Sequence, residues 1–363
     1  MGIADFYRGK RVLVTGHTGF KGSWLSEILL EAGAEVTGYS LEAPTQPNLF
    51  GMLRLEDRMD SVTGDVRDLD GLERVFERVR PQVVFHLAAQ PIVLASYRDP
   101  VGTYGTNVMG TVHVCECVRR TPGVESFVNV TTDKVYDNRE WVWGYRETDP
   151  LDGFDPYSNS KSCSELVTHS YVRSFFSGGG PAVSTVRAGN VIGGGDFAGD
   201  RIVPDCVRAA LEKKPVFVRN PSSVRPFQHV LDPLWVYLMI GARQAETPSL
   251  AGAYNVGPKE EDCVSAGQLA GLFCRFWGEG QSWSGSGSEP AGAKPHEAGF
   301  LKLDCSRLAS AFGWRPVWGI GAAVEKTVEW AKAIRDGEDA RARTIRQLHE
   351  FLEDAGKGGN DYV

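Results

Sequence analysis

Tyr157 and Lys161 stand four residues apart in the sequence Tyr-Ser-Asn-Ser-Lys. On a helix, this spacing places the phenol and the ammonium one turn apart on the same face. Because a nearby cation favours the phenolate, Tyr157 could take a proton from a substrate hydroxyl near neutral pH. The spacing alone is weak evidence, since its ordinary meaning is a solvated helix face. The position of the pair in the fold must decide between these interpretations.

A second candidate for chemistry is the glycine-rich stretch 12–22, Val-Leu-Val-Thr-Gly-His-Thr-Gly-Phe-Lys-Gly. It is typical of a buried strand, a tight turn and the start of a helix. Gly16 would allow the turn, Gly19 would let a pyrophosphate approach bare backbone, and Gly22 would let the helix pack on the strand. The helix N-terminus would then face the phosphates. A strand predicted at 34–40 completes a βαβ unit around this stretch, which favours a dinucleotide site.

Strands and helices alternate along the first half of the chain, and these elements must position both motifs. The pattern predicts strands at 11–16, 34–40, 60–65, 82–89, 126–132 and 182–191, and helices at 23–31, 68–79, 103–120 and 156–176. This alternation indicates a doubly wound parallel sheet, whose nucleotide would lie beyond the carboxyl ends of the strands. Tyr157 begins a helix after the irregular segment 133–155, so it would lie beside that nucleotide.

The pattern changes after residue 190, which predicts a smaller, interleaved α/β lobe. Glycine-rich turns and short elements follow first, and 228–258 then predicts a helix and a strand that return to the main sheet. Residues 278–299 are rich in Gly and Ser and are expected to be a mobile linker. The expected division is a dinucleotide-binding domain at 1–190 with 228–258, a substrate lobe at 191–227 with 259–335, and a C-terminal helix and tail at 336–363.

Composition argues against several classes of function. The net charge is −7 with no block of Lys and Arg, which argues against a nucleic-acid surface. No apolar run is long enough to cross a bilayer and the start has no signal-peptide core, so no membrane partner and a cytoplasmic location are expected. The seven cysteines contain no Cys-x-x-Cys pair, and no His, Asp and Glu cluster has metal-ligand spacing. Neither a disulfide framework nor a metal site is expected.

Together the motifs resemble the extended short-chain dehydrogenase/reductase family. The resemblance rests on the glycine stretch, on GDVRD (64–68), HLAAQP (86–91), Asn107, TTDKVY (131–136) and YSNSK (157–161). It implies a Rossmann-type fold with a bound dinucleotide, and catalysis by Tyr157 and Lys161 together with Thr132. It also implies a homodimer through the helices near 103–120 and 156–176.

Thr132-Asp133-Lys134 narrows the resemblance to the nucleotide-sugar 4,6-dehydratases, in which Thr-Asp-Glu follows the strand. Lys134 departs from that pattern. Together with RAGNVIGGGD (187–196), RPFQHV (225–230) and PHEAG (295–299), this departure makes the chain most similar to the members that act on CDP-glucose. The resemblance therefore implies a nucleotide-sugar substrate.

Chemistry supports this interpretation separately. A plain alcohol dehydrogenase needs only Tyr157, Lys161 and Thr132, whereas eliminating water beside a carbonyl also needs an acid and a base. As a hypothesis, Tyr157 deprotonates the 4-hydroxyl as hydride leaves C4, and Thr132 hydrogen-bonds the developing carbonyl. Asp133 then protonates the departing 6-hydroxyl, Lys134 removes the C5 proton, and hydride returns to C6. The last two roles could be exchanged, because a lysine acts as base only where its pKa falls by about three units. The ordinary alternative is that Asp133 caps a turn and Lys134 is solvated.

The resemblance also implies two binding sites. NAD is expected rather than NADP, because no arginine between residues 39 and 53 could grip a 2′-phosphate. The expected cofactor-binding residues are Gly16, His17, Thr18, Gly19, Phe20, Gly22, Ser40, Asp65, Val66, Leu87, Ala88, Ala89, Tyr157 and Lys161. The expected substrate-binding residues are Ser96, Asn190, Arg201, Arg225 and His296. Arginine suits the diphosphate because its fork makes paired charge-assisted bonds.

Several alternatives remain open. Another nucleotide-sugar 4,6-dehydratase is one, since the sequence identifies no residue that reads the nucleobase. A 4-epimerase would use Tyr157 and NAD without needing Asp133 and Lys134. A redox-sensing binding protein would keep the glycine cradle without catalysis, although the intact Thr132, Tyr157 and Lys161 count against it. A reductase of small ketones would leave the second lobe without a ligand.

Overall fold

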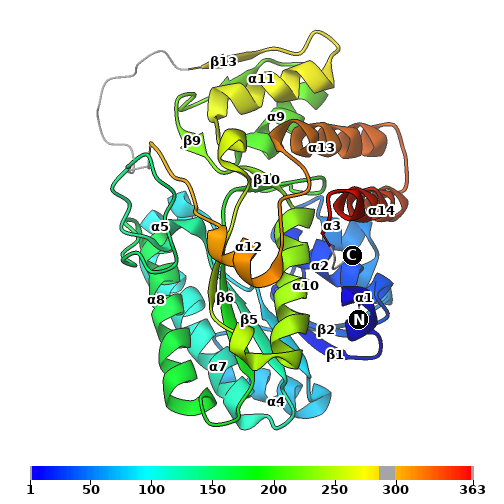
Figure 1. The fold of residues 1–363 in the computed structure, drawn as a ribbon. Coiled ribbons are helices and arrows are strands. Elements are labelled where there is room, and N and C mark those ends of the chain that lie inside the picture. Colours follow the sequence, from blue (N-terminus) through cyan, green and yellow to red (C-terminus); the bar gives the residue numbers. More distant parts are fainter. Residues whose placement is uncertain (1, 286–298, 361–363) are drawn as a thin grey trace.

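Seven parallel strands form the central sheet of the protein in a computed structural model (Figure 1). The structure describes residues 2–285 and 299–360. The strand order is β11-β6-β5-β4-β1-β2-β3, so the winding reverses between β1 and β4. This order confirms the predicted doubly wound α/β fold, and it puts the ligand crevice at that reversal. The strands are β1 (Arg11–Thr15), β2 (Glu35–Ser40), β3 (Asp60–Thr63), β4 (Val83–His86), β5 (Ser126–Val130), β6 (Ala182–Ala188) and β11 (Ala253–Val256).

The inner strands are buried on both faces because helices cover the sheet from both sides. Every residue of β4, β5 and β6 is buried, whereas the edge strand β3 is largely exposed. The strands predicted at 82–89 and 182–191 end earlier, at His86 and Ala188. At the first of these ends the chain leaves the ladder, since the amide of Ala88 donates to the Thr15 hydroxyl at 3.3 Å. The residues that follow line the carboxyl edge of the sheet.

Figure 1 shows α7 and α8 on one side of the sheet and α1, α2 and α10 on the other. The α-helices are α1 (Ile3–Tyr7), α2 (Phe20–Glu31), α3 (Leu49–Met52), α4 (Leu69–Val79), α5 (Val93–Arg98), α6 (Pro100–Tyr104), α7 (Gly110–Arg120), α8 (Pro156–Tyr171), α9 (Ile202–Leu211), α10 (Leu231–Glu246), α11 (Ala266–Trp277), α12 (Ser306–Phe312), α13 (Ile320–Arg335) and α14 (Ala340–Lys357). Short 3₁₀ turns are η1 (Leu55–Asp57), η3 (Asp133–Val135), η5 (Pro248–Leu250) and η6 (Glu260–Asp262), and π turns are η2 (Gly105–Met109) and η4 (Val172–Phe176).

Three predicted helices differ in detail from the observed ones. The helix predicted from 23 begins at Phe20, because Gly19 already has the extended backbone of an N-cap, with φ −77° and ψ 169°. The helix predicted at 103–120 is interrupted by the π turn η2, and the one predicted at 156–176 ends in η4. The helical periodicity therefore located these helices, but it did not show which of their turns are π turns.

A second layer lies above the carboxyl edge of the sheet, where Figure 1 shows α9, α11 and α13. Its strands pair two by two: β7 (Val191–Ile192) with β10 (Gln228–His229), β9 (Val224–Arg225) with β12 (Val264–Ser265), and β8 (Val216–Val218) with β13 (Trp283–Gly285). Its hydrophobic core is separate from that of the sheet. It includes the stacked rings of Phe273 and Trp277, whose centres lie 5.5 Å apart. Of the linker predicted at 278–299, residues 286–298 lie outside the described residues.

No helix in the described part of the chain combines the length and the apolar character needed to span a bilayer. Within residues 2–285 and 299–360, no group of three His, Cys, Asp or Glu side chains could hold a metal ion. All seven cysteines are free thiols, and four of them are buried.

Candidate active site

The glycine turn adopts the geometry that its sequence predicts. Gly16 has φ +77°, and a Cβ there would lie 2.7 Å from the backbone nitrogen of Ala88. A Cβ on Gly22 would lie 2.1 Å from the carbonyl oxygen of Gly16, so helix and strand approach too closely for any side chain. A Cβ on Gly19, by contrast, would meet only the carbonyl oxygen of Gly16, 3.4 Å away, and Gly19 is the N-cap of α2. The turn therefore leaves bare backbone at the N-terminus of a helix.

The side chain of His17 does not face the crevice. It is fully buried, its Nε2 lies 2.7 Å from the hydroxyl of Ser61, and its ring meets Phe50 edge-on. Burial lowers the pKa of His17 to about 4, against a smaller opposing effect of Asp60. The ring occupies the space where a Cβ on Gly38 would lie, 2.2 Å from its Cγ. Only the backbone of His17 could serve the predicted cofactor role.

The other predicted cofactor residues lie along the carboxyl edge of the sheet. Thr18 bonds Ser40 at the end of β2, with 2.9 Å between the hydroxyls. After β3, the carboxylate of Asp65 accepts from Arg67 at 2.9 Å, and this bond lowers the pKa of Asp65 although burial opposes it. The neighbouring Val66 is buried. Three further residues, Phe20, Leu87 and Ala88, pack their side chains against apolar cores on either face of the sheet, and Ala89 is partly exposed.

Helix α8 presents Tyr157 and Lys161 to the end of β5. Asp155 caps the helix by accepting from the amide of Ser158 at 3.0 Å. The Lys161 ammonium donates to the carbonyl oxygen of Val130 at 3.1 Å. Burial raises the pKa of Tyr157 to about 12, although a hydrogen bond with Thr132 opposes the shift. Burial lowers the pKa of Lys161 to about 8.

A hydroxyl, a carboxylate and an amine meet directly after β5. The 3₁₀ turn η3 begins there, with Thr132 as its N-cap. The Thr132 hydroxyl and the Lys134 ammonium both donate to Oδ1 of Asp133, each at 2.9 Å. Asp133 is fully buried, and its Oδ2 has no hydrogen-bond partner among the described residues. The alternative that Lys134 is simply solvated does not fit, because its side chain is engaged and only 28% exposed.

The structure brings some of the predicted substrate residues to this cluster. The Lys134 ammonium also donates to Oδ1 of Asn190 at 3.0 Å. Arg201 precedes α9 and pairs with Asp196 at 3.1 Å, and its charge lies close enough to oppose the upward shift of the Tyr157 pKa. Sequence separations of more than 50 residues are bridged because all these segments end at the same edge of the sheet.

The contacts of two other predicted substrate residues, Ser96 and Arg225, that the structure gives are to nearby backbone. Ser96 is fully buried, and its hydroxyl donates within α5 to the carbonyl oxygen of Val93 at 2.7 Å. Arg225 is 4% exposed and donates to the carbonyl oxygen of Val224 at 2.9 Å. His296 lies outside the described residues. Their roles stay predictions.

Lys21 is a site residue that the sequence prediction missed. Burial lowers its pKa to about 7, and the nearby charges of Lys161 and Arg201 lower it further, while Asp133 opposes them. Its ammonium lies 5.8 Å from the centre of the Tyr237 ring. The available signal was a charged residue inside the glycine motif, in the first turn of a helix that packs on the sheet.

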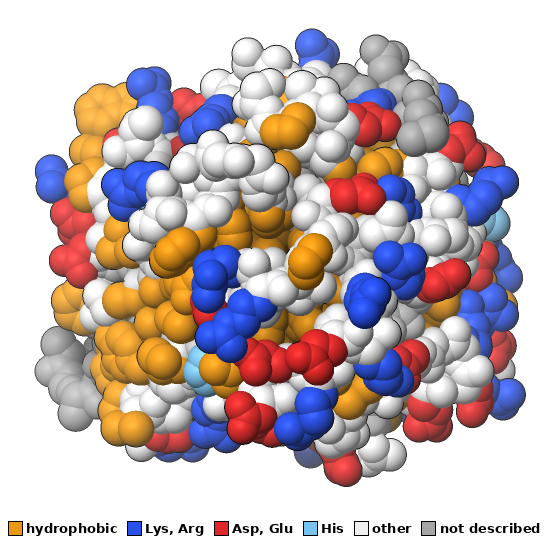
Figure 2. Space-filling view, turned by 90° about the horizontal axis from the view of Figure 1, so that it is seen from below, with side chains coloured by type: hydrophobic (Ala, Val, Ile, Leu, Met, Phe, Trp, Pro, Cys, Tyr) orange, Lys and Arg blue, Asp and Glu red, His pale blue; other side chains and the backbone are white. Residues whose placement is uncertain are grey.

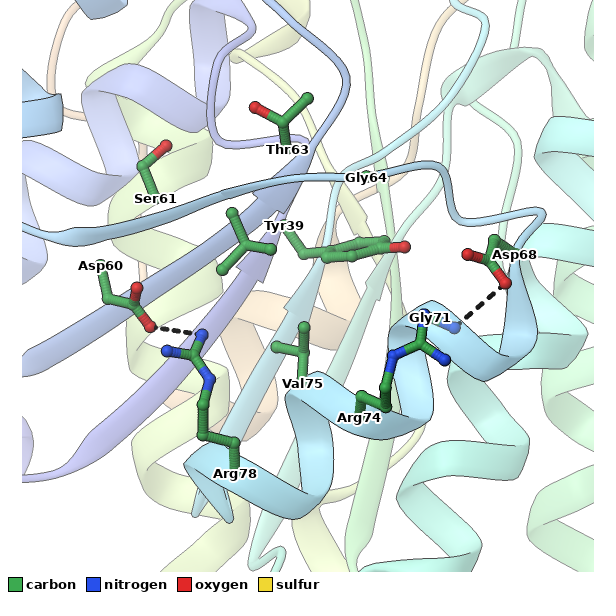
Figure 3. Close-up of a pocket in the computed structure, with 11 residues that line it drawn as sticks. Tyr39, Asp60, Ser61, Thr63, Gly64, Asp68, Gly71, Arg74, Val75 and Arg78 are labelled. Atoms are coloured by element: carbon green, nitrogen blue, oxygen red, sulfur yellow. Dashed lines mark hydrogen bonds and ion pairs between the residues drawn. The ribbon is translucent and has the colours of Figure 1, made fainter.

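Two surface pockets lie apart from the predicted catalytic residues. One, of about 570 Å³, is open at the edge of the sheet. Figure 3 shows Tyr39 between β3 and two arginines of α4, of which Arg78 pairs with Asp60 at 2.8 Å. The other, of about 860 Å³, is lined by Trp141 and Trp143 and by residues around α12. None of the predicted catalytic residues lines either pocket.

Comparisons with known sequences cover nearly the whole chain. Residues 13–327 match the family described as GDP-mannose 4,6 dehydratase. The chain is 47% identical over 354 residues to CDP-glucose 4,6-dehydratase of Salmonella typhimurium, covering 96% of this chain and 98% of that protein. It is 31% identical over 332 residues to dTDP-glucose 4,6-dehydratase of Streptomyces antibioticus, covering 89% of this chain and 93% of that protein.

Solved structures share the same architecture. UDP-glucose 4-epimerase of Thermus thermophilus in complex with NAD matches with a TM-score of 0.75 and 28% identity, over 89% of this chain and 99% of that one. dTDP-glucose 4,6-dehydratase of Bacillus anthracis in complex with NAD matches with a TM-score of 0.73 and 22% identity, over 90% of this chain and 98% of that one. The second likeness shows the fold alone.

Proposed function

Because the chain belongs to the GDP-mannose 4,6-dehydratase family, within the extended short-chain dehydrogenases/reductases, we propose that it converts CDP-D-glucose to CDP-4-keto-6-deoxy-D-glucose. The enzyme is a hydro-lyase, and the conversion is a redox-neutral loss of water. The cytidine nucleotide is supported by 47% identity to a CDP-glucose enzyme along almost the whole chain, against 31% to a dTDP-glucose enzyme. The use of the product for deoxysugars of lipopolysaccharide O-antigen and a cytoplasmic location are parts of this proposal that rest on the resemblance alone.

One observation carries the choice of reaction. The Asp133 carboxylate and the Lys134 ammonium meet at 2.9 Å, and the Thr132 hydroxyl bonds both this carboxylate and the phenol of Tyr157. A 4-epimerase needs only the phenol and its neighbours, whereas dehydration needs an additional acid and base beside the ring. A buried acid–base pair at this point therefore supports a dehydratase over an epimerase.

The glycine turn fits a dinucleotide, and we propose NAD. Gly16 and Gly22 leave no room for a Cβ, and α2 carries no acidic residue in its first turn that would repel a pyrophosphate. Tyr157 and Lys161 would hold the nicotinamide ribose, and Ser40 with Asp65 would border the adenosine. When bound, NAD supplies the chemistry of accepting a hydride from the sugar and returning it. The NAD complex of the Thermus thermophilus relative, at 28% identity, supports this cofactor.

Tyr157 is the proposed base toward the 4-hydroxyl of the sugar. With a pKa of about 12, Tyr157 is almost wholly protonated at neutral pH, so the site must favour the phenolate when substrate is bound. The Lys161 cation, one helical turn away, and the Thr132 hydroxyl are the groups that can do so. In this proposal the Thr132 hydroxyl turns its one proton from Asp133 to the carbonyl oxygen that forms at C4.

Asp133 and Lys134 are the proposed acid and base of the elimination. The Lys134 nitrogen donates to Asp133 and Asn190, which leaves one further position on it for the substrate in this proposal. That position carries a proton in the ammonium form and a lone pair in the amine form. Our nominal assignment makes Asp133 the acid, through its unpartnered Oδ2, and Lys134 the base toward C5.

Deuterium exchange at C5 tests this assignment. In D₂O, Asp133→Asn is expected to block loss of the 6-hydroxyl while Lys134 still exchanges the C5 proton of the oxidised sugar. Lys134→Gln is expected to suppress that exchange, as seen in substrate recovered from the enzyme by mass spectrometry. Exchange retained in Lys134→Gln and lost in Asp133→Asn would reverse the two roles.

We also propose a homodimer through the helices of one side of the sheet. Large apolar side chains are exposed there, among them Val101 at 82%, Met109 at 48%, Leu166 at 53% and Phe175 at 54%. Figure 2 shows hydrophobic side chains gathered on the side where α8 lies. A contiguous exposed apolar patch of this kind is typical of a protein interface.

The domain division is proposed as well. We assign 1–190 with 228–258 to cofactor binding, 191–227 with 259–335 to substrate binding, and 336–363 to a C-terminal helix and tail. The separate apolar centre of α9, α11 and α13 supports the second unit. Arg341 of α14 pairs with the buried Glu27 of α2 at 3.1 Å, which supports the last assignment.

The first test is turnover of three substrates. Purified protein and NAD⁺ are incubated separately with CDP-, dTDP- and UDP-glucose, and product mass and NADH absorbance are followed. Loss of one water from CDP-glucose without net NADH is expected. An unchanged mass with a new sugar stereocentre would indicate an epimerase, turnover of dTDP- or UDP-glucose alone would correct the nucleotide, and no turnover would favour a binding protein.

A further inference from the structure

A buried ion pair lies behind the helix that carries Tyr157 and Lys161. Glu165 follows Lys161 by one turn of α8, and both Glu165 and its partner Arg187 of β6 are fully buried. The guanidinium donates from Nε to one carboxylate oxygen and from Nη2 to the other, each at 3.0 Å. Thr131 and Thr185 donate to the same two oxygens at 2.5 and 2.6 Å. The carboxylate is therefore held in its ionised form.

The pair also connects α8 to the loop of the acid–base cluster. Nη1 of Arg187 donates to the hydroxyl of Tyr136 at 2.8 Å and to the carbonyl oxygen of Glu147 at 3.1 Å. Tyr136 lies two residues after Lys134. For stability alone this arrangement is unremarkable, because apolar residues of similar volume often serve a core as well as a buried ion pair or better. Its position between two catalytic segments indicates another use.

Among the described residues, Glu165 is the anion whose charge acts on Lys161, one turn away on the same helix. From the other packed elements, Lys21 of α2 adds a second cation, and His86 of β4 is buried with a pKa lowered to about 3, first by burial and then by Lys161. Burial lowers the pKa of Lys161 to about 8, and Glu165 opposes this shift. Although burial opposes the charge of Glu165 too, Arg187 holds its pKa below the ordinary value.

We propose that Glu165 and Arg187 are a positioning pair that keeps Lys161 protonated. Arg187 keeps the carboxylate of Glu165 ionised, and that carboxylate offsets the burial of the Lys161 ammonium. The inference rests on the proposed function, because in that function the charge of Lys161 favours the phenolate of Tyr157. The charge itself can be measured without turnover.

The experiment titrates Lys161 by NMR in protein with ¹³C at the lysine ε-carbons, and Lys161→Met identifies its signal. Glu165→Gln removes the charge, and it is expected to lower the Lys161 pKa by roughly one to two units, because a nearby opposite charge favours the charged form of a lysine by about that amount. Thr185→Val is the matched control, because it removes one hydrogen bond to Glu165 and leaves its charge in place.

Glu165→Gln leaves Arg187 buried and unpaired and could therefore unfold the protein, so a double variant is needed. Glu165→Met with Arg187→Met removes both charges and is expected to fold, because such apolar replacements are tolerated in cores. Our inference predicts a lowered Lys161 pKa in this folded variant. The pH dependence of turnover is also expected to shift in the double variant, whereas it should not shift in Thr185→Val. A Lys161 pKa unchanged from wild type in the double variant would overturn it, whether or not the enzyme turns over CDP-glucose.

Discussion

Replacing Lys21 with methionine is expected to stabilise the protein at neutral pH, although the side chain lies in the candidate active site. Burial lowers the Lys21 pKa to about 7, with further lowering by Lys161 and Arg201. The folded protein therefore holds a cation that is poorly solvated and repelled by its neighbours. Methionine keeps the length of the aliphatic stem and removes the charge.

The size and the pH window of this effect follow from the two pKa values of Lys21. In the unfolded chain the pKa is about 10.4, so between pH 7 and about 10.4 the unfolded state binds more protons and the free energy of unfolding rises with pH. Below pH 7 both states are protonated, and the full penalty of about 3 pKa units, or about 4 kcal/mol, is present. Lys21 is partly exposed, so solvent screening reduces this to roughly 2–3 kcal/mol.

The assay is urea unfolding of ligand-free protein between pH 6.5 and 10. Lys21→Met is expected to raise the free energy of unfolding by roughly 2–3 kcal/mol at pH 6.5, and the gain should shrink toward pH 10, because the folded protein has by then lost the Lys21 proton and the unfolded chain approaches its own pKa of about 10.4. Lys213→Met, which changes a fully exposed lysine, should leave the pH dependence of wild type intact. A destabilised Lys21→Met, or one with the same slope against pH as wild type, would refute the reasoning.

Further outcomes are expected at three other points of the molecule and, for ligand binding, at Lys21 itself. Tyr157→Phe should lower kcat for CDP-glucose by about 10²–10⁴-fold without weakening its binding in calorimetry, and a smaller loss would mean another base. Gly38→Ala should cost about 1–3 kcal/mol of unfolding free energy, because its Cβ would lie 2.2 Å from the His17 ring, and His17→Ala should restore most of it in denaturant titration. Leu166→Glu should convert the proposed dimer to a monomer in light scattering, and an unchanged dimer mass would locate the interface elsewhere. CDP binding at pH 8 should take up a proton at Lys21, so that its calorimetric enthalpy depends on the buffer in wild type and much less in Lys21→Met.

The sequence predicted the features that depend on local backbone geometry. A strand–turn–helix unit requires the positive φ of Gly16 and the close backbone approach at Gly22. Three glycines at this spacing predict both features without knowledge of any contact that is distant in the sequence. Tyr157 and Lys161 are likewise related by one helical turn. The proposed acid and base, Asp133 and Lys134, came from the resemblance to the nucleotide-sugar 4,6-dehydratases, with the need of an elimination for such groups as support. The structure brings their side chains together from adjacent positions in the chain.

Other features depend on side chains that meet only after folding. The direction of the His17 ring is decided by Gly38 and Ser61 on neighbouring strands, so the sequence alone could not show that the ring packs against β2 and leaves the backbone of His17 for the predicted cofactor contact. Glu165 has its charged partner 22 residues away, where no helical spacing connects the two. One local signal was overlooked: Ser265 and Gln268 form a capping box at the start of α11, a helix that the sequence analysis did not predict.

The charges around Asp133 destabilise the ligand-free fold and favour the binding of an anion. Lys134, Lys161 and Arg201 all lower the pKa of Lys21, while Asp133 opposes them. Asp196 pairs with Arg201, and Glu165 offsets the burial of Lys161, but Lys21 has no paired anion of its own in the described part of the chain. The ligand-free site is therefore repulsive toward the Lys21 cation. A diphosphate entering the same region supplies the missing negative charge and forms charge-assisted bonds. The repulsion that destabilises the ligand-free fold therefore becomes a source of affinity for an anionic nucleotide. A mutation that relieves this repulsion should stabilise the fold and weaken the binding of the nucleotide.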